Sequence, residues 1–200
     1  MSSPYHQLEN QGIFNQRVLC AIRSLPRELF ISEDYRDFAY QDNPLPIGYG
    51  QTISQPFIVA YMTERLELKT VNKVLEIGTG SGFQTGVLAQ LVHEVYTIEI
   101  YPELSQEAQR VLEKLGYRNV KYKVGNGKLG WFEHAPFDAI IITAVADEIP
   151  SLLLGQLKVG GRIILPLMEV GGQFLVLVKK LMENKFEQQR LIQVSFVPLL

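Results

Sequence analysis

Apolar residues over the second half of the chain alternate between short continuous runs and sets at helical spacing. Val74 to Ile77 is a short apolar run of the kind buried in parallel sheets, and the alternation that begins there predicts strands at about 73–77, 94–98, 119–124, 137–143 and 161–166. The helically spaced sets predict helices at about 83–92, 102–115 and 148–157. Because strands and helices alternate, we expect an α/β fold with a doubly wound, mostly parallel sheet and helices on both faces.

The two ends of the chain depart from this alternation. Gln173 to Lys180 and Gln189 to Val197 are strand-like runs with no room between them for a crossover helix. They predict a C-terminal antiparallel hairpin at the sheet edge. At the other end, apolar positions from about Gln7 to Leu25 predict an amphipathic helix that Pro26 ends or kinks. An N-terminal helical cap without chemistry accounts for residues 1–40.

Residues 42–56 contain three prolines and two glycines, which predict an ordered loop rather than a regular element. Its tip carries the hydroxyls of Thr52 and Ser54, and the run from Pro56 to Leu66 predicts a helix with proline in its first turn. Serine is favoured at helix N-caps. Spacing alone therefore favours Ser54 as a cap over a role in chemistry.

The strongest candidate for chemistry is the junction between the first predicted strand and the helix that follows. It reads Gly78-Thr79-Gly80-Ser81-Gly82, and its glycines let the backbone turn tightly and approach a ligand without Cβ atoms in the way. The helix begins with unpaired N–H groups directed at this turn. A ligand with polar groups can bind there.

The spacing of the glycines restricts the ligand. The dinucleotide motif is G-x-G-x-x-G, whereas here Phe83 stands in place of the third glycine, which favours a nucleoside without a pyrophosphate. Glu99 ends the next strand, 21 positions after Gly78, close to the offset of about 20 residues for an acid that binds ribose hydroxyls. These features indicate S-adenosylmethionine; the alternative is a plain tight turn with a solvated glutamate.

Two further strand ends lie on the ligand side, because ligands of open α/β sheets bind beyond the carboxyl ends of the strands. They carry Gly125-Asn126-Gly127 and Thr143-Ala144-Val145. The Asn126 amide suits an adenine edge, which offers both a donor and an acceptor. An equally good interpretation is a loop residue in the left-handed conformation, which asparagine tolerates.

Composition narrows the classes of partner. The chain has 200 residues, 46% of them hydrophobic and 20% charged, which predicts one domain over 1–200 with a sizeable core. A net charge of −2 offers no basic surface for nucleic acid. No apolar run reaches the roughly 18 residues that span a bilayer, and no signal peptide is recognisable. We expect a cytoplasmic protein without nucleic-acid or membrane partners.

Metal and disulfide chemistry are not expected. The single cysteine, Cys20, excludes an internal disulfide and a cysteine-based metal site. The three histidines are far apart in sequence, and none forms a ligand pair at metal spacing.

Several motifs together resemble the protein-L-isoaspartate O-methyltransferases, S-adenosylmethionine-dependent enzymes that repair damaged proteins. The resemblance covers nearly the whole chain, and its motifs are Leu45 to Pro56, Val74 to Gly82, Ala135 to Ala144, Gln156 to Arg162 and Phe196 to Leu199. Gly-Ser-Gly alone indicates only a methyltransferase-like fold. The Gly-Tyr-Gly-Gln-Thr-Ile-Ser-Gln-Pro loop is far more specific to this family.

The resemblance implies a Rossmann-like class I methyltransferase fold in a monomer. Residues 1–60 would form the cap and the substrate loop, and residues 61–200 the cofactor-binding core. In the family, the serine of the Thr-Ile-Ser motif lies beside the sulfonium and the incoming carboxylate. The resemblance therefore implies Ser54 as the catalytic residue, with Thr52 and Ile53 lining the same pocket.

The resemblance also assigns the cofactor residues. Glu76 and the turn from Gly78 to Gly82 would hold the methionine end, and Glu99 the ribose. The family usually has aspartate where this chain has Asn126, and that aspartate accepts a hydrogen bond from the adenine amino group. An asparagine oxygen can still accept it without charge, so weaker cofactor binding is expected.

The implied reaction is methylation of the free α-carboxylate of L-isoaspartyl residues in damaged peptides and proteins, with S-adenosylhomocysteine as the product. The ester then closes to a succinimide, whose hydrolysis returns some normal aspartate. Two alternatives stay open: a methyltransferase of the same fold with another acceptor, and a non-catalytic relative that binds the cofactor. A nicotinamide dehydrogenase is disfavoured by Phe83.

Overall fold

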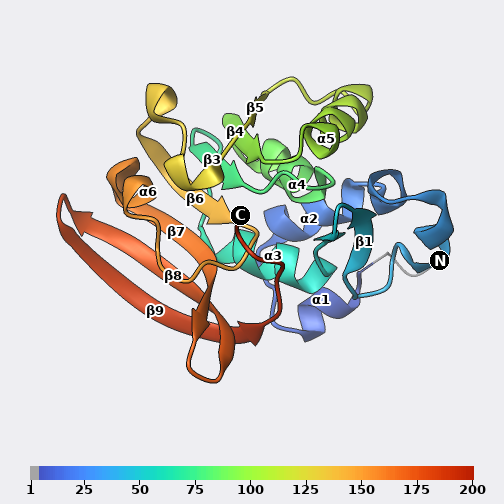
Figure 1. Cartoon of the computed structure of the whole chain (residues 1–200). Helices are drawn as coiled ribbons and strands as arrows, with labels where there is room; N and C mark the ends of the chain where they lie inside the picture. Colours follow the sequence, from blue (N-terminus) through green and yellow to red (C-terminus); the bar gives the residue numbers. More distant parts are fainter. Residues whose placement is uncertain (1–4) are drawn as a thin grey trace.

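A seven-stranded sheet lies at the centre of the computed structural model, which describes residues 5–200 (Figure 1). Its strand order is β5-β4-β3-β6-β7-β8-β9. The strands are β3 (Lys73–Ile77), β4 (Glu94–Glu99), β5 (Val120–Val124), β6 (Phe137–Ile142), β7 (Leu157–Glu169), β8 (Gly172–Met182) and β9 (Lys185–Val194). Strands β3 to β7 pair in parallel, and β8 and β9 add antiparallel. The prediction of a mostly parallel sheet with a C-terminal antiparallel hairpin is confirmed.

The direction of strand addition reverses at β3. This strand pairs with β4 on one side and β6 on the other, so Glu76 stands opposite both Thr97 and Ile141. In open α/β sheets such a reversal leaves a crevice at the carboxyl ends of the strands, where ligands bind. The glycine turn follows β3 directly.

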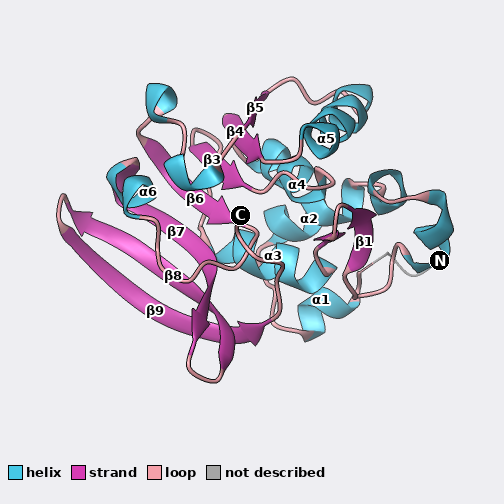
Figure 2. Ribbon diagram, in the orientation of Figure 1, coloured by secondary structure: helices cyan, strands magenta, loops and turns pink. Residues whose placement is uncertain are grey.

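Helices flank both faces of the sheet, and the longer ones share one face (Figure 2). That face carries α2 (Gln16–Ser24), α3 (Pro56–Arg65), α4 (Phe83–Leu91) and α5 (Pro102–Lys114). The other face is covered by α6 (Ser151–Gly155) and the short 3₁₀ helices η3 (Gly127–Leu129) and η4 (Phe132–His134). Because neighbouring residues of a strand point to opposite faces, Ile141 packs in the first core and Ile140 in the second.

The N-terminal region has more breaks than predicted. The single expected helix is divided into α1 (Gln7–Asn10) and α2, and Gly12 between them has a φ of +92°. The Asn15 side chain caps α2 by accepting from the backbone N–H groups of Arg17 and Val18. Two 3₁₀ helices follow, η1 (Arg27–Phe30) and η2 (Glu33–Phe38).

The segment predicted as an irregular loop contains a small antiparallel hairpin. Its strands are β1 (Leu45–Gly48) and β2 (Gln51–Ile53), which form a separate two-stranded sheet. Gly48, Tyr49 and Gly50 all have positive φ values, and they reverse the chain between the strands. Proline is tolerated in β1 because the strand is an edge strand. The prediction of an irregular loop was therefore wrong in this part.

The predicted helix at 148–157 is shorter in the structure. Helix α6 ends at Gly155, and β7 begins at Leu157. Among residues 5–200, no helix combines the length and the apolar character needed to cross a membrane.

Candidate functional site

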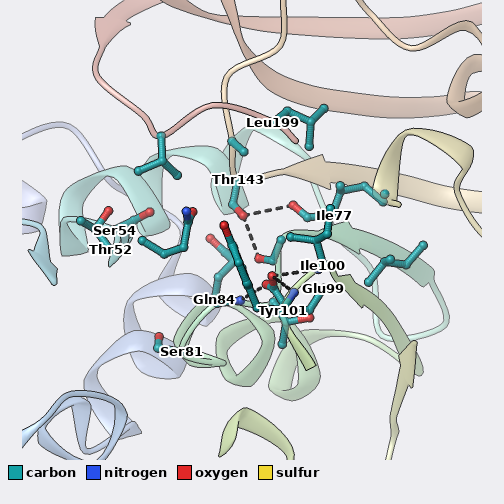
Figure 3. Close-up of a pocket in the computed structure, with 18 of the residues that line it drawn as sticks. Thr52, Ser54, Ile77, Ser81, Gln84, Glu99, Ile100, Tyr101, Thr143 and Leu199 are labelled. Atoms are coloured by element: carbon teal, nitrogen blue, oxygen red, sulfur yellow. Dashed lines mark hydrogen bonds between the residues drawn. The ribbon is translucent and has the colours of Figure 1, made fainter. Parts of the chain in front are cut away.

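A cavity lies beyond the carboxyl ends of β3, β4 and β6 (Figure 3). The structure brings ten of the predicted site residues to its wall: Thr52, Ile53, Ser54, Gly78, Thr79, Gly80, Ser81, Glu99, Gly127 and Thr143. Figure 3 shows Thr52 and Ser54 on one side of the cavity, and Ile77, Glu99 and Ile100 on the other. The substrate loop and the glycine turn therefore face one space.

The glycine turn is fastened to the neighbouring strand by Thr143. This hydroxyl donates to the backbone carbonyls of Gly78 at 2.8 Å and Ile77 at 3.1 Å. Gly78 has a φ of +94°, and a Cβ atom there would collide with the Thr143 hydroxyl. Glycine is required at this position both for its conformation and for the close approach.

Glu99 is held in place by three backbone N–H groups. Its Oε2 accepts from Gly80 at 2.8 Å, and its Oε1 accepts from Ile100 at 2.8 Å and Tyr101 at 3.0 Å. An ionised carboxylate offers about four acceptor positions, so one remains on Oε2. A ligand hydroxyl can occupy that position at the cavity wall.

Glu76 lies behind the turn instead of at the cavity wall. It is 0% exposed, and its Oε2 accepts from the hydroxyls of Thr85 at 2.5 Å and Thr97 at 2.6 Å. Burial raises the pKa of Glu76 to about 8, although the two hydroxyls lower it. Thr97 in turn bonds to the Thr79 hydroxyl at 2.6 Å. Glu76 is thus linked to the cavity wall by hydrogen bonds through Thr97 and Thr79. It does not line the cavity itself, as the direct contact with the cofactor expected from the sequence would require.

Gly82 and Asn126 also lie outside the cavity wall. Gly82 has a φ of +89°, and a Cβ atom there would lie 2.9 Å from the Cβ of Ala108, so it serves the packing of α4 on α5. Asn126 is exposed, and its Oδ1 accepts from the backbone N–H of Lys128 at 2.9 Å. Its φ of −74° shows that the left-handed interpretation was wrong.

The prediction that Ser54 caps the following helix is wrong. The N-cap residue of α3 is Gln55, and the backbone N–H of Phe57 donates to Asp42 Oδ1 at 2.8 Å. Ser54 is half-buried at the cavity wall. Within residues 5–200 its hydroxyl makes no hydrogen bond, which leaves it available to a ligand.

Sequence reasoning missed several lining residues. Ile100 and Tyr101 follow Glu99 directly, and their place after a strand end was a usable signal. The Tyr101 ring packs on Tyr49 of the β1–β2 turn, with centroids 5.2 Å apart. The last residues of the chain, 197–200, also line the cavity. They are held beside β6 by hydrogen bonds in both directions with the Val145 backbone.

The charge of the cavity limits its chemistry. Among residues 5–200, Glu99 is the only acidic side chain that lines the cavity, and no lysine, arginine or histidine lines it. Residues 5–200 also hold no group of three or more His, Cys, Asp or Glu side chains placed to bind a metal ion. The cavity offers one carboxylate, several side-chain hydroxyls and amides, backbone polar groups and apolar walls. These features suit binding and alignment better than acid–base catalysis.

Comparison with known proteins identifies the family. The family described as protein-L-isoaspartate(D-aspartate) O-methyltransferase matches residues 3–200. Protein-L-isoaspartate O-methyltransferase 2 of Pelobacter propionicus is 51% identical over 197 residues, which are 96% of this chain and 86% of the relative.

Solved structures agree with the fold. One named protein-L-isoaspartate O-methyltransferase matches with a TM-score of 0.87 at 30% identity, over 96% of this chain and 63% of that one. A Plasmodium falciparum beta-aspartate methyltransferase, in complex with S-adenosyl-L-homocysteine, matches with a TM-score of 0.86 at 27% identity, over 100% of this chain and 99% of that one. The chain therefore belongs to the protein-L-isoaspartate(D-aspartate) O-methyltransferase family.

Proposed function

We propose that this chain is a repair enzyme that transfers a methyl group from S-adenosylmethionine to the free α-carboxylate of L-isoaspartyl residues in damaged peptides and proteins. The family match over residues 3–200 supports this activity. The observation that carries the proposal is the shared cavity, in which Ser54 faces the glycine turn and Glu99.

The residues present fit the cofactor. The open acceptor position of Glu99 suits a ribose hydroxyl, and Gly78 and Gly80 expose backbone to the methionine end. Ile100 offers an apolar surface for the adenine ring. When bound, S-adenosylmethionine supplies an electrophilic methyl group and leaves as S-adenosylhomocysteine.

Further cofactor contacts are assigned on the same basis. We place Thr79, Ser81, Gly127 and Thr143 beside the cofactor because they line the cavity. Asn126, whose neighbours Gly125 and Gly127 line the cavity, would accept a hydrogen bond from the adenine amino group.

Ser54 acts on the acceptor. Its hydroxyl donates to the substrate carboxylate and orients one oxygen for attack, without becoming a covalent nucleophile. An α-carboxyl group has a pKa of about 3.3–3.7 and is already ionised at pH 7. No general base is required, which suits the lack of histidine and lysine among the lining residues of the described chain.

Alignment and exclusion of water are the remaining tasks of the protein. Well-oriented reactants reach effective molarities of about 10⁵–10⁸ M. Thr52 and Ile53 line the acceptor side, and the segment 197–200 lines the wall next to β6. Together they reduce the hydration of the carboxylate. The methyl ester, once released, closes to a succinimide without the enzyme.

The two parts of the chain are assigned to the acceptor and to the cofactor. We assign the cap and the acceptor side to residues 1–60, of which 1–4 lie outside the described residues, and the cofactor-binding core of a single domain to residues 61–200. We infer a cytoplasmic monomer that acts on isoaspartyl peptides and proteins, without nucleic-acid partners. Size-exclusion chromatography with light scattering tests the monomer, for which a mass near 22.7 kDa is expected.

A pair of synthetic peptides tests the activity. They differ only in Asp or isoAsp at one position, and each is incubated with labelled S-adenosylmethionine. Base-labile label on the isoAsp peptide alone is the expected result. Label on neither peptide, while S-adenosylhomocysteine still binds, would support a non-catalytic relative or another acceptor.

A further inference from the structure

Arg27 is a fully buried cation behind the Ser54 segment. It is 0% exposed and donates four hydrogen bonds to backbone carbonyls. Its Nη1 donates to Ala39 at 2.7 Å and Gln41 at 3.3 Å, and its Nη2 donates to Asn43 at 3.1 Å and Ser54 at 2.9 Å. Within residues 5–200 no carboxylate lies within ion-pair distance of it. The guanidinium of Arg27 thus connects residues 39–43 to Ser54, the residue proposed to orient the acceptor carboxylate.

A buried cation of this kind does not usually increase the free energy of unfolding. Removing a cation from water costs several kcal/mol, and an apolar residue of similar volume is often as stable or more stable. Burial also lowers the pKa of Arg27. A planar guanidinium does provide a rigid fork of donors that fixes the acceptors around it. The hydrogen bonds of Arg27 therefore fix the position of the Ser54 carbonyl.

Asp42 fastens the same segment just beyond Ser54. Its Oδ1 accepts from the backbone N–H of Phe57 at 2.8 Å, and its Oδ2 accepts from the side-chain amides of Gln55 and Gln11, both at 2.9 Å. These bonds hold the residues that follow Ser54 and tie them to the N-terminal helices.

Arg27 also contacts the cofactor side of the cavity. Its Cζ lies 5.7 Å from the centroid of the Phe83 ring. Phe83 begins α4 directly after the glycine turn and lines the same cavity as Ser54. Arg27 therefore lies between the segment that carries Ser54 and the helix that follows the turn.

We propose that Arg27 and Asp42 are positioning residues for the methyl transfer, which fix the Ser54 carbonyl and the backbone that follows it and so align the Ser54 hydroxyl with the acceptor carboxylate. This inference rests on the proposed function and on the role of Ser54 in it. Neither residue is assigned a contact with substrate or cofactor. A misplacement of about 1 Å can lower the rate about 10²-fold. Cofactor affinity should change little, because Glu99 is held by separate bonds.

Two variants and two controls test the proposal. Arg27→Lys keeps the charge but cannot reach four carbonyls, and Asp42→Ala removes the acceptor of the Phe57 N–H. We expect both to lower kcat on the isoAsp peptide at least tenfold, with the Kd for S-adenosylhomocysteine within twofold of wild type. Asp42→Asn should restore kcat to within about threefold, because an amide oxygen still accepts from Phe57. Arg36→Lys, at an exposed ion pair with Glu33, should have no effect.

The readouts separate positioning from general support of the fold. Turnover is expressed per S-adenosylhomocysteine-binding site, so that unfolded protein does not count. If Arg27→Lys does not fold, the Asp42 variants carry the test. Unchanged turnover per site in Asp42→Ala would overturn the proposal, and so would a parallel loss of turnover and cofactor affinity.

Hydrogen exchange provides a test that does not depend on the reaction. Amide exchange in residues 52–57 should become faster in Asp42→Ala and stay slow in Asp42→Asn, while exchange in the glycine turn is unchanged. Unchanged exchange in residues 52–57 would overturn the proposal. Wild-type protein that does not methylate the isoAsp peptide would instead contradict the proposed function.

Discussion

Glu76 and Glu99 lie on neighbouring strands, and their surroundings give the two carboxyl groups different tasks. Glu99 is held by backbone N–H groups at the cavity wall and keeps an acceptor position for a ligand. Glu76 is surrounded by protein and bonds to two threonine hydroxyls. The first residue is placed to bind, and the second to hold the turn through Thr97 and Thr79.

The burial of Glu76 predicts a pH dependence of stability. Burial raises its pKa from 4.5 to about 8, so between these values the folded protein keeps a proton that the unfolded chain has lost. The free energy of unfolding therefore falls as the pH rises from about 4.5 to 8, by up to about 1.4 kcal/mol per pH unit from this group. Glu76→Gln should remove this slope.

Urea unfolding of wild type and Glu76→Gln at pH 5.5, 7 and 8.5 measures the effect. The stability advantage of wild type over the variant should shrink steadily with pH. A difference that is the same at all three pH values would contradict the raised pKa. The slope is the readout, because the new amide N–H groups of glutamine change the absolute stability.

Ser54 is predicted to act on turnover and not on the cofactor. Ser54→Ala removes one hydrogen bond to a charged carboxylate, worth about 1.5–3 kcal/mol, so kcat should fall roughly 10- to 100-fold. The Kd for S-adenosylhomocysteine, measured by calorimetry, should stay within twofold. Ser151→Ala, at an exposed serine of α6, is the control. Wild-type turnover in Ser54→Ala would remove the hydroxyl from the mechanism.

Asn126 is predicted to limit cofactor affinity. In Asn126→Asp the side chain can still accept from the Lys128 N–H, and its charge strengthens a bond from the adenine amino group. A charge-assisted bond is roughly twice as strong as a neutral one, so we expect cofactor affinity to rise about fivefold. Asn184→Asp, in the exposed β8–β9 turn, controls for added charge. An unchanged or weaker affinity would show that the adenine assignment is wrong.

Some residues of the site were predictable and others were not. The glycine turn and Glu99 follow from their spacing along the chain. The burial of Glu76 depends on its register with Thr97 and on Thr85 of the next helix, which spacing does not reveal. Arg27 has backbone carbonyls as acceptors, and these leave no signature in the sequence.

At the scale of elements, the glycine turn also sets the distance between α4 and α5. Gly82→Ala should lower the free energy of unfolding by roughly 1–3 kcal/mol, because alanine is strained at a φ of +89° and its Cβ would lie 2.9 Å from that of Ala108. Gly155→Ala is the matched control, since no atom lies within 4 Å of the new Cβ. Equal stabilities of the two variants, in urea unfolding, would contradict this account of the packing.

The elements were predicted best where the apolar pattern is strong. The inner parallel strands β3 and β6 produce nearly continuous apolar runs because both of their faces are buried, whereas the edge strand β5 alternates with lysines. The β1–β2 hairpin was missed because prolines and glycines indicate a loop, although an edge strand tolerates proline and the turn needs glycine. The break between α1 and α2 occurs within a sequence that keeps its helical spacing.

At the scale of the whole molecule, the reversal of strand order at β3 brings together segments far apart in the chain. The Ser54 segment, the glycine turn and residues 197–200 line one cavity, although more than a hundred residues separate the first from the last. The positions of the predicted strand ends in the sequence were enough to predict the residues on the cofactor side of the cavity. Only the family resemblance indicated that the Ser54 loop faces it, since spacing alone favoured a helix cap.

The most direct measurement follows repair itself. The isoAsp peptide is incubated with the protein and S-adenosylmethionine through repeated cycles, and the isoAsp and Asp forms are separated by chromatography. We predict that the isoAsp form declines and the Asp form accumulates, and that both changes stop when S-adenosylhomocysteine is added in excess. An isoAsp peptide that stays unchanged, with active cofactor binding in the same sample, would contradict the account.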